Sequence, residues 1–401
     1  MAKMEWQVSP AGRRFKKLPF AEADGNLCIN LMSPNHASTK PGRLWQLEAL
    51  RGFAAFYVLL HHVSSGYLKL KYTVWGLPFR FGQEAVLVFF LLSGFVICYS
   101  QALAGKEGAG VSDYFIKRSR RIYPIFILAL LLAYIVNCLA AHAWVPVDFR
   151  QLFGNLFMLQ DHPERPGWAV MPFGGNMPLW SLSYEWWFYM MFYPINRWVS
   201  ARRQKHLVLG LCATGMLVNL FYPNSFCWFL VFFIIWWAGV EMAREFAATG
   251  DVTWQRQKSM VLLLGLPLVW YGIISWHWWQ QGQPLHFITF PLVEFRFFLM
   301  TMVFIGLFFI WKKPAFIGFN QTVGRFYRVG AISYALYLVH YPVICGLRLF
   351  GGEKYFYPDL ALRIVVVFVL AWLAEGIFQK WINRITAPLL KTRVARPRPV
   401  G

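Results

Sequence analysis

An arginine and a histidine that share one helix face are the residues best placed to do chemistry in this sequence. Arg51 and His62 lie in the apolar stretch 44–63 and are eleven residues apart. At about 100° and 1.5 Å per residue, this spacing puts both side chains on one face, separated by about 16 Å along the axis. His61 lies about 80° away from that line. The layout suits an anionic cofactor that is bound at the membrane–water interface while its reactive end meets an imidazole inside the protein.

Other ionisable side chains in apolar stretches add to this set, because such groups are costly at membrane depth and usually face a cavity or a partner. Glu48 precedes Arg51 by three residues, a spacing that lets its carboxylate hold the guanidinium. Glu185 lies among aromatic residues, where a structural ion pair is the alternative to a functional acid. For His340, a hydrogen bond between helices is the alternative to a second titrating group.

A cluster of cations precedes the third apolar stretch, with four cations in the five positions 117–121. The sequence predicts this cluster in the loop that leads into a helix at the cytoplasmic face. Arginine binds phosphate through two parallel hydrogen bonds, so Arg118 and Arg121 are candidates for holding an anionic cofactor. The alternative is that the cluster orients the helix and contacts lipid headgroups.

Two small residues, Ser93 and Gly94, lie inside the second apolar stretch. Small residues let helices approach each other closely, so packing is the main interpretation of this pair. Ser93 has no visible activating base, and no cysteine has a clear base partner. A serine or cysteine nucleophile is therefore less favoured than a histidine. Tyr189, in the same aromatic run as Glu185, is included among the supporting residues.

The composition predicts a polytopic membrane protein. The chain has 401 residues, of which 58% are hydrophobic, 19% aromatic and only 14% charged, more apolar than a soluble domain requires. The net charge of +21 is explained better by basic loops that orient membrane helices and meet anionic lipid than by nucleic acid. The six cysteines are scattered without a C-x-x-C pair, so neither a metal site nor a disulfide framework is expected.

Apolar segments predict an all-α polytopic membrane protein with about ten transmembrane helices and both termini in the cytoplasm. The segments lie near 44–64, 83–102, 122–142, 180–198, 206–222, 226–243, 259–276, 295–311, 329–349 and 360–379. A turn signal at 222–225 separates the fifth from the sixth, with one broken helix as the alternative. In this topology 29 of the 39 Lys and Arg residues are cytoplasmic, 7 lie in outer loops and 3 in spans. Merging the two segments would weaken this asymmetry.

Three parts follow from this reading. Residues 1–43 are predicted to be a basic, largely irregular cytoplasmic tail without a cleavable signal peptide, with a short interfacial helix around 15–23 as the alternative. The transmembrane domain covers 44–379, and 380–401 is a basic cytoplasmic tail. The outer loop 143–178 is long enough to cover a site.

Five motifs, in this order, resemble those of the acyltransferase-3 family of integral-membrane O-acyltransferases, which modify cell-envelope glycans and some small molecules. They are Arg51 with ten residues before His62, Phe90-x-x-Ser93-Gly94-Phe95, Arg118-x-x-Arg121-Ile122-x-Pro124, Trp180-Ser181-Leu182-x-x-Glu185 and Ser333-Tyr334-x-x-Tyr337-Leu338-x-His340. The resemblance covers residues 44 to about 350. The sequence departs from the family at Glu48, where many members have Asp, and at His61, where an apolar or aromatic residue is common.

The resemblance implies transfer of an acyl group, with acetyl expected, from acyl-CoA to a hydroxyl of a cell-envelope glycan or glycolipid. Arg51, Arg118 and Arg121 would hold the coenzyme, which is a donor substrate and not a permanently bound cofactor. His62 would act as general base or take the acyl group itself, and Glu185 would orient the acceptor or the imidazole. The expected location is the inner (plasma) membrane, in contact with lipid and without a nucleic-acid partner.

Two other classes of function compete with this reading. A proton-coupled transporter could use the buried Arg, His and Glu side chains as a relay, but no internal repeat of the kind found in many transporters is evident. A non-catalytic scaffold or receptor leaves the register of Arg51 and His62 unexplained. The sequence identifies neither the acceptor nor the oligomeric state. Trp168, Phe173 and Asn176 of the outer loop are candidates for contacting a sugar.

Overall fold

The computed structural model describes residues 7–8, 14–15, 44–70, 73–104, 110–287, 289–350 and 353–388. Leu44–Gly401 forms one compact unit and Met1–Arg43 another. In the N-terminal unit, β1 (Gln7–Val8) pairs antiparallel with β2 (Arg14–Phe15). Apart from Phe15, the interfacial helix considered for residues 15–23 lies outside the described residues.

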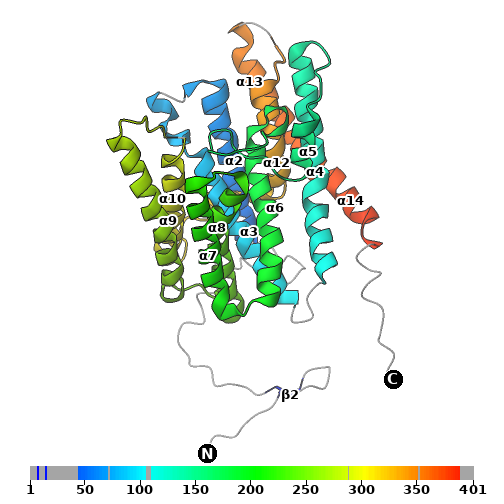
Figure 1. The fold of residues 1–401 in the computed structure, drawn as a ribbon. Coiled ribbons are helices and arrows are strands. Elements are labelled where there is room, and N and C mark those ends of the chain that lie inside the picture. Colours follow the sequence, from blue (N-terminus) through cyan, green and yellow to red (C-terminus); the bar gives the residue numbers. More distant parts are fainter. Residues whose placement is uncertain are drawn as a thin grey trace, which may run out of the picture. The chain divides into compact units, whose positions relative to one another are not determined.

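Helices build the larger unit, as Figure 1 shows. The α-helices are α2 (Trp45–His62), α3 (Gly82–Ala104), α4 (Val111–Ala141), α5 (Phe149–Leu156), α6 (Trp180–Trp198), α7 (Ala201–Phe221), α8 (Ser225–Thr249), α9 (Trp254–Gln280), α10 (Leu292–Lys312), α11 (Tyr327–Gly330), α12 (Ser333–Tyr341), α13 (Phe356–Trp372) and α14 (Gln379–Ile385). Short 3-10 or π segments are η1 (Val63–Tyr67), η3 (Val74–Phe79), η4 (Phe173–Gly175), η5 (Met177–Leu179), η6 (Val323–Phe326), η7 (Pro342–Gly346), η8 (Glu353–Tyr355) and η9 (Leu373–Phe378).

Each of the ten predicted segments contains a helix in the structure, and several of these helices can cross a membrane. Among the described residues, six helices are long and apolar enough to do so, or seven if one bent pair forms a single span. The remaining predicted spans coincide with α2, α6 and α7, which are helical but do not meet the same requirement of length and apolar composition. The structure therefore supports a multi-pass membrane protein, while the count of ten and the sides of the termini stay predictions.

The cation cluster lies on a helix and not in the predicted loop. Helix α4 begins at Val111, eleven residues before the predicted segment 122–142, so Arg118 and Arg121 occupy its second and third turns. The sequence from Val111 to Arg121 contains no Pro or Gly that would end a helix, and charged residues are good helix formers. Their spacing of three places both guanidinium groups on neighbouring parts of one face.

The ninth predicted segment, 329–349, is bent and not continuous. The axes of Val323–Gly330 and Ser333–Gly346 differ by 80°. The Ser333 hydroxyl donates to Gly330 O at 2.8 Å, an interaction that competes with helical backbone bonds. A Cβ on Gly330 would overlap the carbonyl oxygen of Glu48, so this glycine lets the bend pack directly on the backbone of α2.

The split between the fifth and sixth segments is confirmed. Helix α7 ends at Phe221 and α8 begins at Ser225. The Asn224 side chain accepts a hydrogen bond from the Cys227 backbone N–H at 3.0 Å, which caps the first turn of α8. The predicted turn therefore works as a helix boundary.

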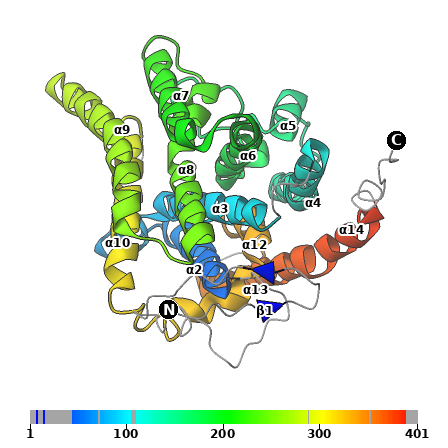
Figure 2. The ribbon, with the colours of Figure 1, turned by 90° about the horizontal axis from the view of Figure 1, so that it is seen from below.

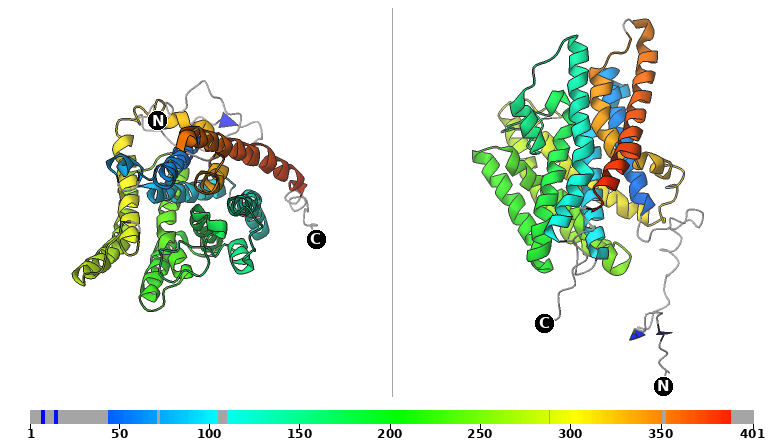
Figure 3. Two further views of the ribbon diagram at one scale, coloured as in Figure 1. Left: turned by 90° about the horizontal axis from the view of Figure 1, so that it is seen from above. Right: turned by 90° about the vertical axis from the view of Figure 1, so that its right-hand side faces the viewer.

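Helix α3 occupies the centre of the bundle and contacts α2, α6, α8 and α10. Seen from below and from above, α9 and α10 lie at one side of α3, and α4 and α5 lie at the other (Figures 2 and 3). The tightest approach joins α3 to α8, because a Cβ on Gly94 would overlap the carbonyl oxygen of Trp236, and one on Gly239 would overlap that of Leu91. The predicted packing role of Gly94 is thus confirmed.

Gly94→Ala is expected to destabilise the protein by about 1–3 kcal/mol, because the added methyl group meets backbone that cannot rotate away. The unfolding temperature of the detergent-solubilised protein measures this effect. Gly265→Ala in α9 is the matched control, since a Cβ there meets no atom within 4 Å. Equal unfolding temperatures for the two variants would contradict the close approach of α3 and α8.

Candidate active site

A cavity of about 220 Å³ lies where α2, α3, α4, α6 and α12 meet. Its polar lining consists of Arg51, Ser93, Arg118, Arg121, Ser181, Glu185, Tyr189, Ser333, Tyr334 and Tyr337, and its apolar lining comes mainly from α3. Pockets that enclose a drug-sized ligand usually measure about 300–1,000 Å³. A cavity of this size would enclose only part of a large ligand.

The three arginines of the cavity differ in how they are held. Arg51 of α2 is 4.0 Å from Glu48, so the predicted pairing is present at the limit of an ion pair. The guanidinium of Arg118 lies over the ring of Tyr114 at 5.3 Å and over that of Tyr189 at 5.7 Å. Its Nε is buried and has no hydrogen-bond partner among the described residues. Arg118 therefore presents an unused donor within the cavity lining.

Arg121 is tied to a carboxylate instead. Its Nη1 and Nη2 donate to the two oxygens of Glu375 at 2.8 and 2.7 Å, and the guanidinium lies over the Tyr334 ring at 5.2 Å. Glu375 is only 4% exposed, whereas the side chain of Arg121 is 40% exposed. Glu375, in the π segment η9, was missed by sequence reasoning, because nothing in its neighbourhood links it to residues 254 positions earlier.

Helix α6 supplies a carboxylate with two hydroxyl partners. Ser181, Glu185 and Tyr189 recur every four residues and so share one face of the helix, which faces the cavity. Ser93 Oγ donates to Glu185 Oε1 at 2.8 Å, and the Tyr189 hydroxyl donates to the same oxygen. Ser93 Oγ and Tyr189 OH are 2.9 Å apart. Ser93 was expected to lack a base, and the structure corrects this.

His62 does not line the cavity. Its ring lies 5.1 Å from that of His340 and 4.9 Å from that of Tyr341, measured between centroids. The Nδ1 of His340 is 3.1 Å from Leu336 O, and because a carbonyl can only accept, this nitrogen carries the proton. The Nε2 of His340 then holds the lone pair, and it is buried without a partner among the described residues. His62 and His340 therefore form a pair of imidazoles with an available base nitrogen.

His61 is occupied elsewhere. Its Nδ1 lies 2.5 Å from the carbonyl oxygen of Phe79 in η3, so this nitrogen donates to the loop that follows η1. A Cβ on Gly82 would overlap the His61 ring, which shows that the imidazole is packed against the start of α3. Of the two adjacent histidines, only His62 lies within ring contact of His340.

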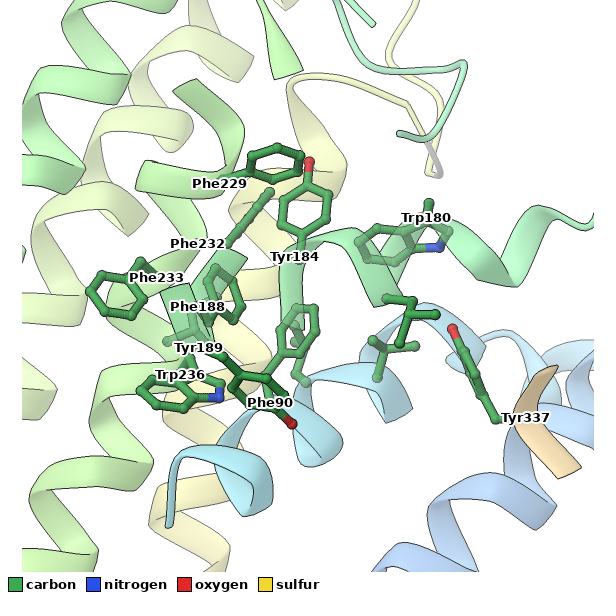
Figure 4. Close-up of a cluster of buried hydrophobic side chains, with 14 of the residues drawn as sticks. Phe90, Trp180, Tyr184, Phe188, Tyr189, Phe229, Phe232, Phe233, Trp236 and Tyr337 are labelled. Carbon is green, nitrogen blue, oxygen red and sulfur yellow. The ribbon is translucent and has the colours of Figure 1, made fainter. Parts of the chain in front are cut away.

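Aromatic rings separate the cavity from the imidazole pair. Phe89 and Tyr337 both line the cavity, with ring centroids 5.7 Å apart. Beyond them the Tyr337 ring is 5.8 Å from that of His340. Figure 4 shows Tyr337 on the far side of Trp180 from the rings of α6 and α8, among which Tyr189 lies. We call Phe89 and Tyr337 the aromatic partition.

The structure thus divides the predicted site residues into two groups. Arg51, Arg118, Arg121, Ser93, Glu185 and Tyr189 share the cavity, whereas His62 and His340 lie beyond the aromatic partition. His62 is not among the residues that line this cavity, so the single passage from Arg51 to His62 stays a prediction. Within the described part of the chain, the hydrogen bonds to Glu185 come from the hydroxyls of Ser93 and Tyr189.

The outer loop is anchored by a buried arginine that sequence reasoning missed. Arg165 donates to Asp161 at 3.1 Å, to Glu294 at 3.2 Å and to Tyr184 OH at 3.1 Å. Burial raises the pKa of Asp161, and the guanidinium opposes this rise. Burial, reinforced by Arg165, lowers the pKa of the neighbouring His162 to about 3, so this imidazole is neutral at physiological pH.

Two of the three loop residues considered for sugar contact are structural. Phe173 is buried, and Asn176 is fully buried, with its Nδ2 donating to Leu338 O at 2.9 Å. Trp168 is 40% exposed and lines a shallow groove together with Asp148 and Arg150. Another acid, Glu84 at the start of α3, is buried in an ion pair with Arg296.

Comparison with known proteins agrees with the motifs. Acyltransferase MdmB of Streptomyces mycarofaciens is similar, at 24% identity over 88% of this chain and 91% of that protein. ORF330 of Acidianus two-tailed virus, named provisionally as an acetyltransferase, is 27% identical over 44% of this chain and 48% of its own. No solved structure matches. The family model described as an acyltransferase domain matches residues 44–376, which include every helix that lines the cavity. The chain therefore belongs to the acyltransferase-3 family and is an acyl-transferring enzyme.

Proposed function

We propose that this membrane enzyme moves an acyl group, with acetyl expected, from acyl-CoA to a hydroxyl of a cell-envelope glycan or glycolipid. Three arginines converging on one cavity are the observation that carries the donor assignment. Coenzyme A presents phosphates, and guanidinium groups bind phosphate through paired, charge-assisted hydrogen bonds. We place the protein in the inner (plasma) membrane, where a cytoplasmic donor and an envelope acceptor meet.

The size of the cavity suits the thioester end of such a donor. A space of about 220 Å³ accepts the acyl group and part of the arm that carries it, while the nucleotide and its phosphates lie at the mouth. Arg51 and Arg118 are the preferred phosphate ligands, because Arg121 already shares both of its terminal nitrogens with Glu375. Glu185, with Ser93 and Tyr189, then lies next to the thioester.

The imidazole pair of His62 and His340 acts on the acceptor hydroxyl. His62 acts as general base on the acceptor hydroxyl, and His340 supports it from 5.1 Å. A neutral imidazole is suited to this task near pH 7. The aromatic partition must move for the acyl group to pass from the cavity to His62. The bend between α11 and α12, five to six residues before Tyr337, provides a place for that movement.

Arg118→Ala is expected to weaken binding of acetyl-CoA by about 10-fold or more, because a hydrogen bond to a charged group contributes about 1.5–3 kcal/mol. The turnover rate at saturating donor should change less than the binding constant. Calorimetric titration of the purified protein with acetyl-CoA, together with steady-state rates, measures both quantities.

Arg120→Ala is the matched control for this measurement. It removes the same charge from the same helix, but Arg120 is not in the cavity lining and donates to Thr386 O and Asn383 Oδ1. Binding by Arg120→Ala should stay within about 2-fold of the wild type. Equal losses in the two variants would mean that the cluster attracts the donor only through its overall charge. The acceptor class is tested by mass spectrometry of envelope glycans from cells with and without the gene.

The bent helix is the one observation that favours the transporter reading. Discontinuous helices often line transport sites, and the 80° bend lies beside the cavity. Reconstituted protein separates the two functions. Acetyl transfer in proteoliposomes without a pH gradient supports the enzyme. Proton flux coupled to solute movement, with no acetyl transfer, would support the transporter.

A further inference from the structure

Ser93 is the hydroxyl of the cavity that has the chemistry of a nucleophile. It lies on α3 in the cavity lining, half-buried, with its Oγ donating to Glu185 Oε1 at 2.8 Å. Serine becomes nucleophilic when an adjacent base can take its proton. A carboxylate at hydrogen-bond distance is such a base, and the Tyr189 hydroxyl donating to the same oxygen fixes its orientation.

The cavity lining brings this pair to the place where the thioester of the proposed donor lies. Ser93, Glu185 and Tyr189 all line the cavity, and Ser93 Oγ lies 2.9 Å from the Tyr189 hydroxyl.

We propose that Ser93 is acylated by the donor before the acceptor receives the acyl group, an inference that rests on the proposed function. Ser93 Oγ attacks the thioester carbonyl carbon and forms the C–O bond, while Glu185 takes the Ser93 proton. The carbonyl C=O bond then re-forms as the C–S bond breaks, and Glu185 gives the proton to the departing thiolate. The products are an ester of Ser93 and free coenzyme A.

The position of Ser93 along α3 suits a relay. Phe89 of the aromatic partition lies four residues earlier on the helix, about 6 Å along its axis. An acyl group on Ser93 therefore lies on the donor side and within one helical turn of the partition. Coenzyme A can leave before the partition opens, so the donor and the acceptor need not be bound at the same time.

The experiment is isotope exchange without an acceptor. Purified protein is mixed with unlabelled acetyl-CoA and tritiated coenzyme A, and label entering acetyl-CoA is counted. An acyl-enzyme returns its acetyl group to the labelled coenzyme, so exchange is expected, whereas direct transfer gives none. Acid quenching after incubation with labelled acetyl-CoA, followed by peptide mass spectrometry, should place the acetyl group on Ser93.

Variants identify the residue. Ser93→Ala should lose exchange by at least about 100-fold, a loss in the range expected for one essential group in covalent catalysis. Ser100→Ala, an exposed serine on the same helix whose hydroxyl donates to Ile97 O, should exchange like the wild type. Ser93→Cys tests whether a loss of exchange in Ser93→Ala reflects a folding defect. In a folded Ser93→Cys protein, the thiol should take the acetyl group as a thioester, which neutral hydroxylamine cleaves.

The outcomes distinguish failure of the Ser93 step from failure of the proposed acyltransferase function. Wild-type protein that binds acetyl-CoA and acetylates an acceptor without exchange overturns the Ser93 step and leaves the proposed function intact. Label on Tyr189 or His62 overturns it in the same way. Wild-type protein that neither binds acetyl-CoA nor transfers its acetyl group overturns both.

Discussion

Replacing His62 by Ala is expected to lower acyl transfer to the acceptor by about 10²–10⁴-fold, the contribution of a positioned general base. The imidazole lies within ring contact of His340, whose buried Nε2 has no partner among the described residues, so the pair is prepared to accept a proton. The rate of acetyl transfer from labelled acetyl-CoA to envelope glycan, measured in membranes with matched protein levels, tests this expectation.

His61→Ala is the control for His62→Ala. It removes a neighbouring imidazole of the same size, but one whose Nδ1 is committed to the carbonyl of Phe79. The control should therefore cost some stability in the loop around η3 and keep most of the transfer rate. Unchanged transfer in His62→Ala, or equal losses in both variants, would remove His62 from the mechanism.

Arg165→Ala is expected to have the largest effect on folding, about 3–5 kcal/mol, because removing one partner of a buried ion pair leaves an uncompensated charge. Arg165 is 3% exposed, and both Asp161 and Glu294 are fully buried. The guanidinium also lies within 4.6 Å of the Trp180 ring centroid, so truncation removes packing as well as charge. The unfolding temperature and the yield of folded protein in detergent measure the loss.

A combined variant separates the charge effect from the packing effect. Adding Asp161→Asn and Glu294→Gln to Arg165→Ala removes the two carboxylate charges that the guanidinium no longer compensates. This combined variant should recover part of the lost stability. Arg150→Ala, in the same outer region but exposed, should unfold like the wild type. Asp161 Oδ1 also accepts from the Tyr184 hydroxyl at 2.9 Å and from the His162 backbone N–H at 2.7 Å, and the side-chain oxygen introduced by Asp161→Asn could keep both bonds. A combined variant less stable than Arg165→Ala alone would show that the loss does not come from uncompensated charge.

The sequence predicted much of the helical layout because the signal for a membrane helix is local. Long apolar runs need no knowledge of their neighbours, and the Asn224 cap marks the split between α7 and α8 within four residues. The bend before α12 was missed for the opposite reason. It depends on Gly330 fitting against the backbone of α2, a contact between residues almost three hundred positions apart.

The candidate site was predictable in its residues more than in its arrangement. Helical periodicity placed Arg51 and His62 on one face, but it could not show that Phe89 and Tyr337, from two other helices, pack together at the cavity, or that Tyr337 also contacts His340. Hydrogen bonds between helices have no local signal, so the approach of Ser93 to Glu185, 92 residues later, was invisible. The motif at 333–340 contained Tyr334 and Tyr337, yet nothing in it indicated that these rings line a cavity.

The aromatic partition has a consequence for the energy supply of the cell. A continuous aqueous path from the arginine end to the imidazole end would let protons run down their gradient, since histidines and carboxylates relay them readily. The rings of Phe89 and Tyr337, tilted by 57° with centroids 5.7 Å apart, pack together at the cavity, and the Tyr337 ring also contacts His340. A partition closed in the absence of substrate would limit proton flow between the two regions to the periods in which the rings move.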